Sequence, residues 1–267
     1  MIELRAQSTA AAVEVDVSPS DGGRIARLAV AGRELLVLGD GHTDPLLWGS
    51  YPMVPFAGRL CDGQLTVDGR VLQLPRNMPP HAIHGTGFTS RWDVLDAGLD
   101  HVELSVALTW PLGGRAHQHV QLTAGALVCV LTVRADDRPM PVTLGWHPWF
   151  VKPDADRFEF ASMYERGADH LPTGRLVAPA SRPWDDCFTG STASPRLVYR
   201  PTATAPGIVV TLDSDCDHWV VYDEPAHATC VEPQSGPPDA ARLGAGHVLA
   251  PGEMLQRTMT IRWSVEP

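Results

Sequence analysis

Met140-Pro-Val-Thr-Leu-Gly-Trp-His-Pro-Trp-Phe150 is the stretch that predicts most about the fold of this chain. Its apolar residues alternate, and in a β-strand successive side chains point to opposite faces. The two predicted faces are Val142, Leu144 and Trp146 on one side and Thr143, Gly145 and His147 on the other. Because Pro148 has no N–H for a sheet ladder, we expect the strand to end there or to become an edge strand.

His147 therefore lies at an expected strand end, between Trp146 and Trp149. A titratable group beside flat apolar rings suits a sugar site, because pyranose C–H faces stack on aromatic rings and hydroxyls bind polar groups. In this interpretation Trp149 binds the sugar by stacking. The alternative is a core histidine whose ring nitrogens are satisfied by the protein.

Short β-type runs separated by turn residues recur along the whole chain. The clearest hairpin is Leu65–Leu74, in which Asp68-Gly69 is a turn pair that tolerates positive φ. Further runs cover residues 12–17, 24–38, 92–95, 101–110, 117–123, 127–135, 208–212, 219–222, 229–232 and 254–265. No stretch has a convincing amphipathic helix pattern, although residues 239–243 could form one turn. The sequence predicts an all-β sandwich or barrel with very little helix, and a single domain over residues 1–267.

Composition excludes several classes of function. The 267 residues include 21 basic and 31 acidic side chains, so the net charge is 21 − 31 = −10, which argues against nucleic acid and anionic membranes as partners. The five cysteines are scattered and form no Cys-x-x-Cys pair, so zinc and thioredoxin chemistry are not expected. No signal peptide or membrane-spanning run is recognisable, and we expect a cytoplasmic protein.

Three other stretches carry groups suited to a sugar site. Arg59 follows a glycine in a proline-punctuated loop and could bind vicinal hydroxyls; an ordinary surface arginine is the alternative. Asp185 lies beside Trp184 and could accept from hydroxyls; the alternative is a solvated turn. Glu232 ends an apolar strand just before a proline, where partial burial would raise its pKa and make it a usable general base.

Metal sites are weaker interpretations of the sequence. His81 and His84 have a helical chelating interval, but the neighbouring prolines and glycine argue against a helix. A second histidine pair and an acidic segment with calcium-loop intervals are better explained as surface strands: His117 and His119, and Asp213, Asp215, Asp217 and Glu224. We therefore predict no metal.

Taken together, these stretches resemble the aldose 1-epimerase, or galactose mutarotase, family. The resemblance rests on seven segments that occur in the family's order: Gly22–Leu36, Pro55–Leu60, Ile83–Gly85 with Arg91-Trp92, Gly145–Phe150, Trp184–Phe188, Val231–Ala240 and Leu249–Glu253. Each motif alone is unspecific, but together they span nearly the whole chain. The resemblance implies a large antiparallel β-supersandwich with an open groove.

The resemblance also implies an isomerase that interconverts the α and β anomers of a free aldose without a cofactor. Glu232 would take the proton of the anomeric hydroxyl, and His147 would protonate the ring oxygen, with His84 contacting the same region. Arg59 and Asp185 would hold hydroxyls, although Asp186 is an adjacent candidate. Two more residues next to the motifs are expected near the sugar: His81 and Arg91. We expect a sugar as the only small-molecule partner and a monomer or homodimer.

Departures from the family pattern concern the sugar more than the reaction. Gly58 stands where the family usually has asparagine, Thr86 follows the first histidine motif, and the chain is short. One alternative is a hexose-6-phosphate mutarotase of the same fold, which would need clustered cations; the candidates are Arg59, Arg76 and Arg91. Another alternative is a carbohydrate-binding protein without turnover, but binding alone does not require both His147 and Glu232.

Overall fold

One large antiparallel sheet dominates the fold in the computed structural model, which describes residues 1–5, 12–42 and 44–266. Its 17 strands are β1 (Ile2–Leu4), β2 (Val13–Ser18), β3 (Arg24–Val30), β4 (Arg33–Glu34), β5 (Ser50–Met53), β10 (Asp93–Ala97), β11 (His101–Ala107), β12 (Arg115–Leu122), β13 (Ala126–Arg134), β15 (Gly145–Val151), β16 (Ala155–Arg166), β17 (Pro172–Val177), β18 (Asp185–Tyr199), β19 (Gly207–Ser214), β20 (His218–Tyr222), β21 (Ala228–Gln234) and β23 (Met254–Glu266). The predicted all-β fold class is confirmed.

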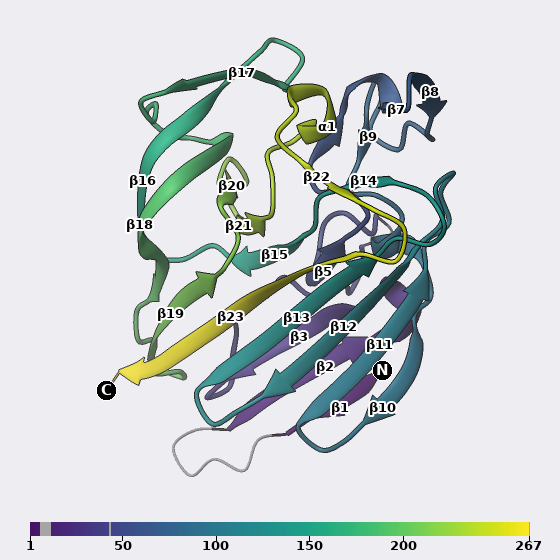
Figure 1. The fold of residues 1–267 in the computed structure, drawn as a ribbon. Helices are drawn as coiled ribbons and strands as arrows, with labels where there is room; N and C mark the ends of the chain where they lie inside the picture. Colours follow the sequence, from purple (N-terminus) through teal and green to yellow (C-terminus); the bar gives the residue numbers. More distant parts are fainter. Residues whose placement is uncertain (6–11, 43, 267) are drawn as a thin grey trace.

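The sheet curls over itself, so that strands β1–β3 lie behind β11–β13 (Figure 1). The main core fills the space between these layers and includes Leu28 of β3 and Val120 of β12, both fully buried. Gln118 joins the layers, because its amide donates to the Gly23 carbonyl at 2.6 Å and accepts from the Trp146 indole at 3.2 Å. This core holds β15, which carries the central stretch of the sequence, at a fixed position.

Short elements complete the fold. They are β6 (Arg59–Leu60) paired with β9 (Ala82–Ile83), β7 (Gln64–Val67) with β8 (Arg70–Gln73), β14 (Met140–Val142) with β22 (His247–Leu249), the helix α1 (Ala240–Leu243), and 3₁₀ turns at Pro19–Asp21, Cys61–Gly63 and Gly87–Thr89. The β7–β8 hairpin confirms the predicted Asp68-Gly69 turn, with φ of 48° and 73°. Among the described residues, no helix has the length and apolar character needed to cross a bilayer.

The central stretch forms two strands, β14 and β15, and the expectation that its strand ends at Pro148 is wrong. β15 continues to Val151 because Pro148 lies in an interval of the β15–β21 ladder that has no paired residues. That interval separates the pairs Gly145–Gln234 and Trp149–Cys230. The missing N–H of Pro148 therefore falls where the β15–β21 ladder has no pair, and Pro148 stays paired with Ser50 of β5 on its other side.

Strands β16, β17 and β18 were not expected from the sequence. β16 and β18 pair with each other over most of their length and project beside the curled layers (Figure 1). Many of their side chains are exposed, so their sequences lack apolar alternation. The segment with calcium-loop intervals begins at the end of β19 and includes all of β20, and the carboxylate of Asp213 accepts from Ser194 and Arg262.

Candidate active site

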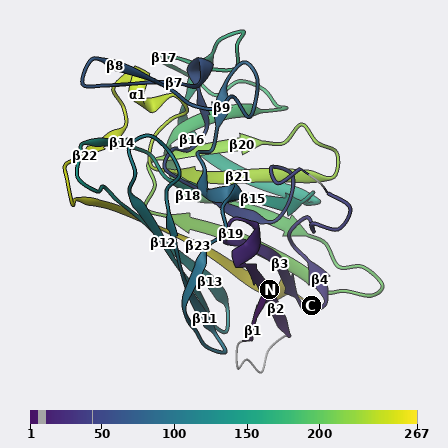
Figure 2. The ribbon, with the colours of Figure 1, turned by 90° about the vertical axis from the view of Figure 1, so that its right-hand side faces the viewer.

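A cavity of about 370 Å³ opens between the strands that carry the predicted catalytic residues. Strands β15, β21 and β20 lie side by side there (Figure 2). The cavity is lined by Leu46, Leu47, Tyr51, Gly58, Arg59, Met78, Ile83, His84, His147, Trp149, His170, Asp185, Val220, Tyr222, Glu224, Glu232, Gln234 and Pro238. Six of the eight residues that the sequence assigned to the site are therefore brought together.

His147 and Glu232 form the centre of this cavity wall. The register of β15 and β21 places them directly opposite each other, two residues inward from the pairs on either side. Their side chains share one face, and His147 Nε2 lies 3.2 Å from Glu232 Oε1. The exposed fractions are only 6% and 2%. The interval without ladder pairs is thus where the two strands present an acid–base pair.

Aromatic rings enclose His147. Tyr51 is its direct partner across the β5–β15 pairing, and the two rings stack with centroids 4.8 Å apart. Trp149, two residues further along β15, lies nearly parallel to His147 at 5.5 Å. Because both rings are apolar surfaces, they remove water from the imidazole and fix its orientation.

His84 faces the same pair from a strained turn. Its φ is +59°, and its ring centroid lies 5.0 Å from that of His147. The Gly58 N–H donates to His84 Nδ1 at 3.2 Å, and the His84 N–H donates to the Gly58 carbonyl at 3.0 Å. Because Nδ1 accepts a hydrogen bond, the neutral ring carries its proton on Nε2, where it is a donor.

Burial favours the neutral forms of Glu232, His147 and His84. It raises the pKa of Glu232 well above its usual range, and Asp185 adds to this effect. It lowers the pKa of His147 to about 3 and the pKa of His84 well below its usual range. The sequence predicted the raised pKa of Glu232. The expected imidazolium at His147 is not the resting form: the pair holds one proton, on the carboxyl, and becomes an ion pair when that proton moves to His147.

Arg59 and Asp185 occupy another part of the cavity wall. Arg59 NH2 donates to Asp185 Oδ2 at 3.1 Å, and both side chains are mostly buried. The positive charge of Arg59 lowers the pKa of Glu232, which opposes the effect of Asp185. This pair offers both a donor and an acceptor to a polar ligand in the cavity.

His84, His147 and Glu232 also form a donor set that could hold a metal ion, since one ligand atom from each lies within 4.8 Å of the others. A ligating histidine normally donates its second ring N–H to an acceptor. The second nitrogen of His84 instead accepts from Gly58. The geometry therefore fits hydrogen bonding and proton transfer better than metal binding.

Two of the residues that the sequence assigned to the site do not line the cavity. The ring of His81 is held elsewhere, by the Asp62 N–H at 3.2 Å and the Asp169 carbonyl at 3.0 Å. Arg91 is exposed, and it follows the 3₁₀ turn Gly87–Thr89. Being next to a motif in sequence did not place either side chain in the cavity.

Sequence reasoning missed three residues near the site. Gln234 donates from Nε2 to Glu232 Oε2 at 3.1 Å, and its position two residues after Glu232 on one strand was a usable signal. Tyr222 lines the cavity, and its ring meets Trp149 edge-on. Arg166 bonds to Asp185 from β16, a strand with no recognisable sequence pattern.

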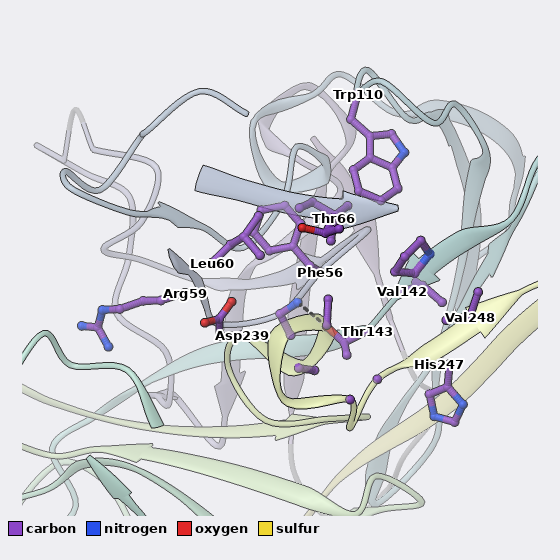
Figure 3. Close-up of a pocket in the computed structure, with 17 residues that line it drawn as sticks. Phe56, Arg59, Leu60, Thr66, Trp110, Val142, Thr143, Asp239, His247 and Val248 are labelled. Atoms are coloured by element: carbon purple, nitrogen blue, oxygen red, sulfur yellow. Dashed lines mark hydrogen bonds between the residues drawn. The ribbon is translucent and has the colours of Figure 1, made fainter. Parts of the chain in front are cut away.

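A second cavity, of about 200 Å³, lies between α1, β7 and β14 (Figure 3). Its walls are largely apolar, and the Arg59 side chain points away from it. Asp239 is paired with Arg242, and His247 lies 3.4 Å from Arg257. This cavity has no free acid–base pair, so the His147–Glu232 cavity is the candidate active site.

Comparison with known proteins gives one family for the chain. The sequence pattern of the family described as aldose 1-epimerase matches residues 8–262. The uncharacterized protein YphB of Escherichia coli K12 is 26% identical over 244 residues, which cover 79% of this chain and 82% of that protein.

Solved structures with the same fold come from several organisms. An Escherichia coli K12 protein provisionally assigned as an aldose 1-epimerase has a TM-score of 0.84 at 22% identity, covering 99% of both chains. A galactose mutarotase-like protein from Clostridium acetobutylicum has a TM-score of 0.81 at 17% identity, covering 95% of this chain and 93% of that one. At these identities the similarity concerns the fold, which is the antiparallel β-supersandwich that the family resemblance implied.

Proposed function

The chain belongs to the aldose 1-epimerase family, and on this premise we propose that it is a mutarotase that interconverts the anomers of a free aldose without a cofactor. The observation that carries the proposal is the buried His147–Glu232 pair, with 3.2 Å between Nε2 and Oε1, on the wall of a cavity large enough for a monosaccharide. A protein that only binds a sugar has no need to bury such a pair.

The reaction requires two proton transfers. Glu232, as carboxylate, takes the proton of the anomeric hydroxyl while His147, as imidazolium, gives a proton to the ring oxygen and the C1–O5 bond breaks. The aldehyde turns about C1–C2 and the ring closes on the other face with the proton roles reversed. General acid and base each contribute about 10²–10⁴-fold, which is adequate for a reaction that already proceeds in water.

The other residues orient the sugar in this proposal. His84 donates from Nε2 toward the ring oxygen, and Trp149 offers an apolar ring on which the sugar stacks. Arg59 and Asp185 bind hydroxyls. The pair starts in its neutral form, and moving one proton from Glu232 to His147 gives the reactive ion pair without taking a proton from solvent.

The relaxation of optical rotation in freshly dissolved α-D-glucose and α-D-galactose tests the proposal. We expect the protein to accelerate the relaxation of at least one sugar, and to do so equally in the presence of EDTA. No acceleration with either sugar would contradict the proposed activity. Acceleration that EDTA abolishes would contradict the metal-free reaction proposed here.

A further inference from the structure

The carboxylate of Asp185 is held by more side chains than a single sugar contact needs. Arg59 NH2 lies 3.1 Å, Arg166 NH1 3.4 Å and His170 Nδ1 3.7 Å from it, and all three approach the same oxygen, Oδ2. Among the described residues, none donates a hydrogen bond to the other oxygen, Oδ1. Asp185 lines the cavity and keeps 16% of its side chain exposed, so Oδ1 is available to a ligand.

Arg166 makes the most contacts in this cluster. Besides the carboxylate, its NH1 donates to the Asp185 main-chain carbonyl at 2.9 Å, and its Nε lies 3.3 Å from Asp186 Oδ1. The guanidinium therefore fixes both the backbone and the carboxylate at the first residue of β18. A planar guanidinium with several donors is suited to such a multiple contact, because its geometry is rigid.

The cluster lies at one border of the cavity. A small pocket adjoins the cavity and is lined by all four residues of the cluster: Arg59, Arg166, His170 and Asp185. The three catalytic candidates line the cavity but not this pocket. A sugar whose C1 lies at Glu232 and His147 would therefore present a hydroxyl of its remote ring edge to Asp185. Two arginines face two aspartates there, so the charges balance, and the ligand that fits the free oxygen is an uncharged hydroxyl.

We propose that Arg166 is a positioning residue that, with Arg59, turns the Asp185 carboxylate so that Oδ1 accepts a hydrogen bond from one hydroxyl remote from C1. The inference rests on the proposed function for the position of C1. It assigns to Arg166 a part in sugar recognition and none in the proton transfers.

The test combines Arg166→Met with sugars that lack one hydroxyl each. For wild type, we expect one of the 3-, 4- or 6-deoxy analogues to raise KM about tenfold, the usual effect of leaving a buried polar group unpaired. For Arg166→Met we expect KM of the parent sugar to rise about tenfold, kcat to change less than about threefold, and the penalty for that analogue to disappear. Arg166→Lys should restore part of the loss.

Arg157→Met is the matched control, because Arg157 lies on the same strand and, of the residues that the structure describes, pairs only with Glu159. It should leave KM, kcat and the deoxy-sugar penalties unchanged. Thermal unfolding of each variant shows whether Arg166→Met remains folded. If Arg166→Met is unfolded, Arg166→Lys replaces it in the test. In Arg166→Lys we expect the deoxy-sugar penalty to be smaller than in wild type but not lost.

Equal deoxy-sugar penalties in wild type and Arg166→Met would overturn the inference, as would a fall in kcat at unchanged KM. Calorimetric binding constants for the same sugars separate this result from failure of the proposed function. If wild type turns over no sugar but binds one, the binding penalties decide the role of Arg166 and the mutarotase proposal alone fails. If no sugar binds, both fail.

Discussion

His147 and Glu232 are buried so deeply that each prefers its neutral form. Burial lowers the pKa of His147 to about 3 and raises that of Glu232 well above its usual range. Above the pKa of His147 and below the raised pKa of Glu232, the pair holds one proton, which rests on the carboxyl and can pass to His147 across a contact of 3.2 Å. A reaction that both removes and delivers a proton needs one acid and one base, and a pair with one proton supplies both.

The pH dependence of turnover follows from these directions. Lowering the pH adds a second proton to the pair only near the pKa of His147, about 3, and raising the pH removes the first proton only near the raised pKa of Glu232. We predict that kcat/KM changes less than about twofold between about pH 5 and 8. Polarimetry corrected for buffer catalysis measures this. An acid limb with its midpoint near 6.5, the ordinary pKa of histidine, would contradict the account.

At the residue scale, the sequence predicted the residues that line the cavity better than the residues that support them. Residue type and the family resemblance selected His147 and Glu232, although both lie inside their strands and not at the predicted strand ends. Arg166 could not be selected, because its role depends on the pairing of β16 with β18, which no local sequence pattern indicates. His81 and Arg91 were selected because they adjoin motifs, but the backbone carries both side chains away from the cavity.

At the scale of elements, the loop between β5 and β6 positions His84 in the site. Gly58 has a φ of +72°, and a Cβ there would lie 2.8 Å from Pro238. Its N–H and carbonyl both bond to His84. The loop therefore sets the orientation of His84 through its backbone, and only glycine allows this close approach.

Gly58→Ala should disturb this arrangement. The positive φ alone costs about 1–2 kcal/mol of unfolding free energy, and the contact with Pro238 displaces the loop and His84 with it. We predict a loss of stability of at least this size and a fall in kcat of about tenfold or more. Chemical denaturation and polarimetry measure the two effects.

Gly69→Ala is the control for this prediction. Gly69 has a similar φ of +73°, but a Cβ there meets nothing within 4 Å, and it lies in the β7–β8 turn. Gly69→Ala should lower the free energy of unfolding by the same amount of about 1–2 kcal/mol that the positive φ costs, and it should leave kcat unchanged. If both variants kept full activity, the role assigned to the Gly58 backbone would be wrong.

Local pattern predicted elements that a turn pair or apolar alternation marks in the sequence. The β7–β8 hairpin and the strands of the curled layers carry clear turn pairs or apolar alternation. β18 contains Thr189-Gly-Ser-Thr-Ala-Ser-Pro195, which has the composition of a loop, and it is a strand because β16 pairs with it. The strand end predicted at Pro148 is wrong because the ladder interval beside it depends on β21, about 80 residues later in the chain.

At the scale of the whole molecule, net charge bears on the substrate. A charge of −10 repels phosphorylated sugars, and Arg59, the one member of the suggested phosphate cluster that lines the cavity, is already paired with Asp185. Arg76 instead bonds to the Asp62 carbonyl, at 2.9 Å. A free sugar fits this molecule better than a hexose 6-phosphate.

Ionic strength distinguishes the two substrates. We predict that kcat/KM for a free aldose is unchanged between about 0.02 and 0.5 M salt, because a neutral ligand feels no net long-range force. At low salt, kcat/KM for a hexose 6-phosphate should be at least tenfold lower than kcat/KM for the free aldose. It should rise with salt concentration, because salt screens the repulsion. Preference for the phosphorylated sugar at low salt would show that the charge argument fails.

The most direct test of the central claim, that Glu232 and His147 are the acid–base pair of a mutarotase, is polarimetry of wild type, Glu232→Gln and His147→Asn with the best free aldose, together with calorimetric binding of that sugar. We predict that each substitution lowers kcat by about 10²-fold or more. The dissociation constant for Glu232→Gln should stay within about threefold of wild type. Turnover that survives Glu232→Gln would contradict the claim.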